Sequence, residues 1–171
     1  MVSGTALDAV LARRLQLGDP GGHMRRALAP FPVPEAVAYV LDRYFVEGGI
    51  ASGERMRATA RLRADRDEIA ELLAVLGKFV EAWLAKERHD GPVGVNCLAK
   101  IPLATSPALF GAILDGVDHV LVGAGIPGQI PALASRLARA EPVTTLVGVG
   151  RGTRKRFRIP AIRGVGSGPT A

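Results

Sequence analysis

The sequence of 171 residues is long enough for one globular domain with a hydrophobic core. Hydrophobic residues make up 48% of it, which excludes a mainly disordered chain. We find no apolar run of the ~18 residues that a membrane span needs, and no pattern typical of a signal peptide. The single cysteine, Cys97, excludes an intrachain disulfide. We therefore expect a cytoplasmic protein without a membrane partner.

The net charge of +6 is concentrated at the end of the chain. No acidic residue follows Glu141, whereas six basic residues lie between Arg151 and Arg163. Without these six, 16 basic residues balance 16 acidic ones. We therefore expect a domain over residues 1–150 and a basic, disordered tail over residues 151–171. We do not expect nucleic-acid binding, because no known binding motif or interleaved aromatic residues accompany the tail.

Most elements expected in the first half are helical. Residues 1–5 are typical of a strand end and its turn. Apolar residues at helical spacing predict helices over 6–15, 23–28, from Pro34 onward and 65–86, with Gly77 as a possible interruption of the last helix. We interpret residues 22–88 as a helical insertion.

The second half alternates between strands and helices. The pattern predicts strands over residues 92–98, 117–122 and 142–149, separated by helices over 107–114 and 127–138. This alternation is typical of an α/β fold whose parallel strands are joined by right-handed crossovers.

Two strand ends carry residues suited to a ligand, since ligands bind at the carboxyl edge of parallel sheets. Asn96, near the end of one strand, offers a donor and an acceptor to a flat heterocycle, although it could instead cap the next turn. The turn of Gly123, Ala124 and Gly125 precedes a helix, so its backbone could approach a phosphate or a ring. The alternative for these three residues is a tight strand-to-helix turn.

The turn of Ser3, Gly4 and Thr5 has a similar character, although Thr5 could simply cap the first helix. Lys100 could reach a phosphate or a carbonyl group, or lie in solvent. We expect no metal site, because the three histidines lack metal-binding spacing, and we interpret Cys97 as an inert buried thiol.

Four stretches together resemble the nitronate monooxygenase family, formerly called 2-nitropropane dioxygenase. They are VSGTALD from Val2, GDPGGH from Gly18, FVEAWLAKERHDGPVGVNCL from Phe79 and VDHVLVGAGIP from Val117. Members of this family are FMN-dependent (β/α)₈ TIM barrels. The resemblance implies that the protein is an oxidoreductase that converts alkyl nitronates, with O₂, to carbonyl compounds and nitrite.

The resemblance also implies residue roles. Asn96 would contact the flavin, and Gly123, Ala124 and Gly125 would approach the flavin or the substrate. Ser3, Gly4 and Thr5 would lie close to the cofactor, with Lys100 in the loop after the Asn96 strand.

The chain departs from the family pattern in two places. Only two residues precede Ser3, where the first strand with its Gly-rich turn is expected, and no Gly-Gly-His catalytic histidine follows Val149. We therefore expect a partial barrel that lacks the first strand and the C-terminal half, is weakly active or inactive alone, and associates through exposed sheet edges. The alternatives are an FMN-dependent enoyl reductase-like enzyme and a non-catalytic, basic-tailed nucleic-acid-binding fragment.

Overall fold

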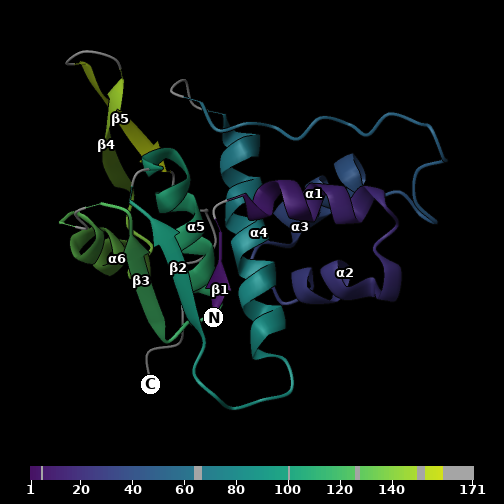
Figure 1. Ribbon diagram of the computed structural model, residues 1–171, viewed down its shortest axis with the longest axis horizontal. Helices are drawn as coiled ribbons and strands as arrows, with labels where there is room; N and C mark the ends of the chain where they lie inside the picture. The colour runs from purple at the N-terminus through teal and green to yellow at the C-terminus, as the bar shows by residue number, and fades with distance from the viewer. Residues whose placement is uncertain (5, 64–66, 100, 126–127, 150–152, 160–171) are drawn as a thin grey trace.

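The computed structural model of the protein describes residues 1–4, 6–63, 67–99, 101–125, 128–149 and 153–159. Within these ranges it has a mixed α/β fold, with a small parallel sheet, helices beside it and an antiparallel strand pair (Figure 1). The elements are β1 (Val2–Ser3), α1 (Leu7–Gln16), η1 (Pro20–Gly22), α2 (His23–Leu28), α3 (Pro34–Tyr44), α4 (Glu68–Lys86), β2 (Gly94–Leu98), α5 (Pro102–Leu114), β3 (His119–Gly123), α6 (Ile130–Ala138), β4 (Val143–Val149) and β5 (Thr153–Ile159).

The parallel sheet has the strand order β1-β2-β3. Strand β1 pairs Ser3 with Asn96 of β2, and β2 in turn pairs Leu98 with Gly123 of β3. Val95 of the central strand is fully buried, because alternate side chains of β2 face the helices. The expected α/β fold with parallel strands is confirmed at this level.

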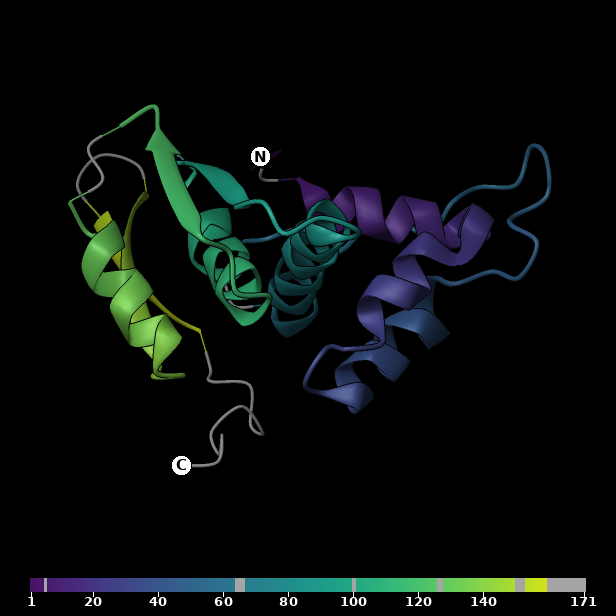
Figure 2. The same cartoon turned by 90° about the horizontal axis from the view of Figure 1, so that it is seen from below.

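Helix α4 forms the centre of the molecule. It packs against α5 on one side and against α1 and α2 on the other (Figure 2). Two glycines allow these close approaches: an added Cβ would lie 2.1 Å from the Val75 carbonyl oxygen at Gly111, and 2.6 Å from the Leu7 carbonyl oxygen at Gly77. The expected interruption at Gly77 is wrong, since α4 runs through it and uses the missing side chain for packing.

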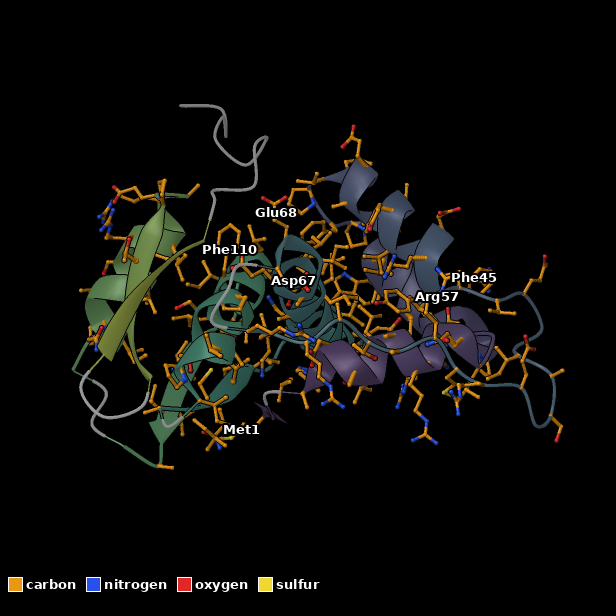
Figure 3. All side chains as sticks on the ribbon, turned by 90° about the horizontal axis from the view of Figure 1, so that it is seen from above. Met1, Phe45, Arg57, Asp67, Glu68 and Phe110 are labelled. Atoms are coloured by element: carbon orange, nitrogen blue, oxygen red, sulfur yellow. The ribbon has the colours of Figure 1, made fainter. Side chains whose placement is uncertain are left out.

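The first turn of α4 is closed by the side chain of Asp67, which accepts hydrogen bonds from the backbone N–H groups of Ile69 (3.1 Å) and Ala70 (3.0 Å). Figure 3 shows Asp67 and Glu68 at this end of the helix. Such a cap satisfies N–H groups that have no partner within the helix, and it fixes where α4 begins. The described residues between Tyr44 and Glu68 form no helix, so the expected helical insertion is only partly helical.

Helix α5 begins at Pro102, five residues before the predicted start at Pro107. Pro107, the first residue of the predicted helix, therefore lies inside it. The Thr105 hydroxyl donates to the Ile101 carbonyl oxygen at 2.9 Å, in the turn that precedes Pro107. The predicted start was therefore wrong by five residues.

Strand β4 was predicted to join the parallel sheet, but it does not. It pairs antiparallel with β5, with Val143 opposite Ile159 and Val149 opposite Thr153. Strand β5 lies in the segment that was expected to be a disordered tail, so regular structure extends past residue 150. Strand β4 thus pairs with a strand close to it in sequence and not with a strand of the parallel sheet. The hydrophobic period of the sequence predicts a strand in either case, so it does not distinguish the two pairings.

None of the helices within the described ranges is long and apolar enough to cross a membrane.

Candidate functional site

The sheet brings the predicted strand-end residues to one edge. Ser3 is the last residue of β1 and lies level with Asn96 on the neighbouring strand. Gly123 is the last residue of β3, and a Cβ added to it would lie 4.0 Å from the Asn96 Oδ1 atom. Ser3 and Gly123 therefore end their strands, and Asn96 lies between them, two residues before the end of β2.

Asn96 is half-buried, and its side-chain amide makes no hydrogen bond to another described residue. The turn after β2 is held instead by backbone groups, since the Ala99 N–H donates to the Gly123 carbonyl oxygen at 2.9 Å. Among the described residues, Asn96 therefore does not act as the turn cap that was its alternative role. No described residue occupies its donor or acceptor, which a ligand could use.

The turn after β3 needs its small residues for geometric reasons. Ala124 has a φ of +54°, in the left-handed region that residues with a side chain adopt at a cost. A Cβ on Gly125 would lie 2.8 Å from the Ala99 Cβ, so the glycine lets this turn pack against the turn after β2. Helix α6 begins at Ile130 rather than at the predicted residue 127, and Gln129 is its N-cap. The helix N-terminus is therefore farther along the chain from Gly123 than predicted.

The remaining predicted site residues are placed in part. Gly4 is exposed, has a φ of +104°, and its carbonyl oxygen accepts a hydrogen bond from Lys78 Nζ at 3.0 Å. Thr5 and Lys100 lie outside the described residues. The N-cap residue of α1 is Ala6, without a side-chain hydrogen bond.

The histidines lie away from this edge. His119 is exposed at the amino end of β3, opposite Gly94. His89 Nδ1 accepts from the Gly91 N–H at 3.0 Å, before β2 begins, and His23 Nδ1 lies 3.1 Å from an Arg26 nitrogen. Within the described ranges, no group of three or more His, Cys, Asp or Glu residues could hold a metal ion.

Lys78 is a polar residue near the edge that the sequence analysis missed. Its side chain is only 1% exposed, and burial lowers the pKa of its amine. Burial also raises the pKa of the neighbouring Cys97 thiol, against the opposing effect of the Lys78 charge, which favours the interpretation of Cys97 as an inert thiol. A lysine in a helix normally indicates a solvent-facing side, but here it stands among buried apolar residues from Leu73 to Val80, and that position was the available signal.

A cavity of about 400 Å³ lies between α5, α6 and the start of β4. Ala99, Thr105, Gln129, Leu133, Arg136 and Thr144 line it together with their neighbours. The cavity touches the turn after β2 through Ala99, but Ser3, Asn96 and Gly123 do not line it. Arg136 donates to the Glu141 carboxylate at 3.2 Å and to the Pro142 carbonyl oxygen at 2.7 Å, so its guanidinium is already engaged.

The candidate site is therefore the carboxyl edge of β1, β2 and β3, with Asn96 at its centre. Lys78 contacts it through the Gly4 carbonyl oxygen, and the cavity touches it through Ala99. Comparisons with known protein families, curated proteins and solved structures found no match, so the functional argument rests on this geometry and on the residues that form it.

Proposed function

We propose that the carboxyl edge of the parallel sheet forms part of an FMN site in an oxidoreductase similar to the nitronate monooxygenases. The observation that supports this proposal is the convergence of Ser3, Asn96 and Gly123 on neighbouring strand ends. Ligands of parallel α/β proteins bind at this edge, and the sequence around these residues resembles that family.

The residues of the edge are compatible with a flavin. The amide of Asn96, which has no partner among the described residues, can donate to and accept from the polar rim of a flat heterocycle. The absence of a side chain at Gly123 leaves room beside that amide, and a Cβ at Gly4 would meet no atom within 4 Å. Bound FMN would supply the electron-accepting chemistry, while Asn96 and the two turns would orient its ring.

The proposed substrate is an alkyl nitronate, with O₂ as the final electron acceptor, and the products are a carbonyl compound and nitrite. No histidine of the described ranges lies at the edge, so we assign no catalytic residue. An enoyl thioester reductase is the alternative chemistry for the same cofactor, and it differs in taking its electrons from NAD(P)H.

The proposed architecture is part of a (β/α)₈ barrel in which β1, β2 and β3 are successive strands. Strand β3 is at one edge of the sheet, and its Val120 and Leu121 are 36% and 44% exposed. An edge strand with exposed apolar side chains favours pairing with a further strand. We include association through this edge in the proposal.

FMN titration of ¹⁵N-labelled protein tests the site directly. We expect FMN, added up to about millimolar concentration, to shift the side-chain amide of Asn96 and the backbone amides of Gly4 and Gly123. Asn96→Leu, which keeps the size of the side chain and removes the amide, should abolish the shifts of Gly4 and Gly123. Shifts that are absent, or that are confined to the arginine-rich residues after 150, would contradict the proposed site.

Turnover distinguishes the two chemistries. Nitrite release from an alkyl nitronate in the presence of FMN and O₂ is the proposed activity, at most weak for this chain alone, and Asn96→Leu should lower it. Reduction of the flavin by NAD(P)H, without nitrite release from nitronate, would instead indicate the enoyl reductase chemistry.

A further inference from the structure

Lys78 is a buried lysine that contacts the carboxyl edge of β1, β2 and β3 through Gly4. Lys78 belongs to the part of α4 in which every residue from Leu73 to Val80 is buried, and only 1% of the lysine is exposed. Burying a charged amine costs free energy unless hydrogen bonds compensate for the lost water. Its Nζ atom donates to the carbonyl oxygen of Gly4 at 3.0 Å, across 74 residues of sequence.

Gly4 is the residue that this hydrogen bond holds. It follows the last residue of β1, is exposed, and has a φ of +104° that residues with a side chain rarely adopt. A Cβ added to it would meet no atom within 4 Å, so no described side chain packs against that side of the residue. The hydrogen bond from Lys78 therefore holds the Gly4 peptide group at a position where no described side chain packs against an added Cβ.

Gly77, the residue before Lys78, contacts the chain on the other side of the turn between β1 and α1. Gly77 lies against the start of α1, where an added Cβ would be 2.6 Å from the Leu7 carbonyl oxygen and 2.7 Å from the Asp8 nitrogen. Two consecutive residues of α4 thus contact the chain on both sides of the turn between β1 and α1. Lys78 is also close enough to Cys97 for its charge to affect that thiol, and Cys97 follows Asn96 directly in β2.

We propose that Lys78 is a positioning residue that orders the Gly4 turn at the ligand edge, so that the turn is fixed before a flavin binds. The inference rests on the proposed function for the identity of the ligand, but the ordering of Gly4 does not depend on it. A turn that is already ordered loses less conformational entropy on binding, and the ligand therefore binds more tightly.

Backbone ¹⁵N relaxation tests this role without a ligand. We expect an order parameter near about 0.85 for Gly4 in the unsubstituted protein, and a value below about 0.6 in Lys78→Met, which keeps an unbranched apolar chain and removes the donor. Lys86→Met is the matched control: Lys86 donates from the far end of the same helix to the carbonyl oxygens of Asp115 (2.7 Å) and Gly116 (2.9 Å). It should leave the order parameter of Gly4 unchanged.

The FMN titration adds a second readout. In folded Lys78→Met the dissociation constant for FMN should rise about tenfold, whereas Lys86→Met should leave it unchanged. Equal order parameters of Gly4 in the unsubstituted protein and in Lys78→Met would overturn the inference. If Lys78→Met does not fold, the unsubstituted protein decides: an order parameter of Gly4 below about 0.6 would show that the lysine does not fix the turn. If FMN shifts no residue of the unsubstituted protein, the proposed function fails, while the order parameters still decide the role of Lys78.

Discussion

Gln16 on α1 and Arg57 in the segment before α4 exchange two hydrogen bonds across 41 residues of sequence. The Gln16 Nε2 atom donates to the Arg57 carbonyl oxygen at 3.1 Å, and the Arg57 N–H donates to Gln16 Oε1 at 2.6 Å. The amide of a buried glutamine thereby pairs with the main chain of an irregular segment, which Figure 3 shows beside the helices at Arg57. This pairing attaches the segment to the helical core.

Replacing Gln16 by leucine should destabilise the protein by about 1–3 kcal/mol. The substitution keeps the volume but leaves both polar groups of the Arg57 main chain without their partner. Chemical denaturation measures the change. Arg57→Ala is the control, because the side chain of Arg57 is exposed and the two bonds use only its main chain. An equal loss in both variants would contradict a specific main-chain contact.

Replacing Gly111 by alanine should destabilise the contact between α4 and α5 by more than about 2 kcal/mol. The new Cβ would lie 2.1 Å from the Val75 carbonyl oxygen, so the two helices would have to separate. Thermal unfolding followed by circular dichroism gives the shift. Gly128→Ala should have little effect, since an added Cβ meets no atom within 4 Å there. If Gly111→Ala has the same unfolding temperature as the unsubstituted protein, α4 and α5 do not approach as closely at Gly111 as described.

Asp115 should make the protein less stable as the pH rises through about 4 to 6. Burial raises the pKa of its carboxyl group from 3.8 to about 6, although the nearby Lys86 opposes the shift. Because the folded state binds this proton more tightly than the unfolded state, its contribution favours folding at low pH and is lost as the pH rises past the folded value. Asp115→Asn should reduce this loss by roughly 1–3 kcal/mol.

Denaturation midpoints at pH 4.5 and pH 7.5 test the role of Asp115. The difference between the two should be smaller in Asp115→Asn than in the unsubstituted protein. Asp90→Asn, on an exposed loop, is the control for the loss of one negative charge. The same pH dependence in all three proteins would show that Asp115 does not titrate as described.

Asp19→Ala should lower the unfolding temperature more than Asp19→Asn does. The buried carboxylate accepts from the backbone N–H groups of Met24 (2.9 Å) and Arg25 (3.0 Å), and from Arg25 Nε (3.2 Å). Asp19 also has a φ of +48°, which asparagine tolerates better than alanine. We expect a loss of about 1–3 kcal/mol for alanine, or several degrees in unfolding temperature. Similar losses in both variants would argue against an acceptor role.

The sequence allowed the local elements to be predicted better than the partners of those elements. Helix α2 was predicted with the observed bounds, and β2, β3 and the carboxyl edge were located by strand alternation and small residues. Asn96 and Gly123 come together because parallel strands align their carboxyl ends, a rule that follows from topology alone.

The errors fall where a long-range contact decides the structure. Gly77 and Lys78 look like an interruption and a surface charge in the sequence of one helix, but each is explained by a residue about 70 positions away, at Leu7 or Gly4. Strand β4 was predicted as a strand, while its pairing with β5 depends on which neighbour is available. Periodicity reports which face of an element is apolar, and it does not report what covers that face.

The pairing of β1 with β2 has a consequence for synthesis on the ribosome. Val2 pairs with Val95, so the first strand must wait for 93 further residues before its partner exists. At about 5–20 residues per second this delay is about 5–20 s, which is long compared with the formation of a helix. For the part of that time before residue 86 is added, α1, α2 and α3 are complete but α4, against which α1 and α2 pack, is not. The nascent chain therefore exposes apolar helix faces for seconds, the period in which a chaperone would bind it.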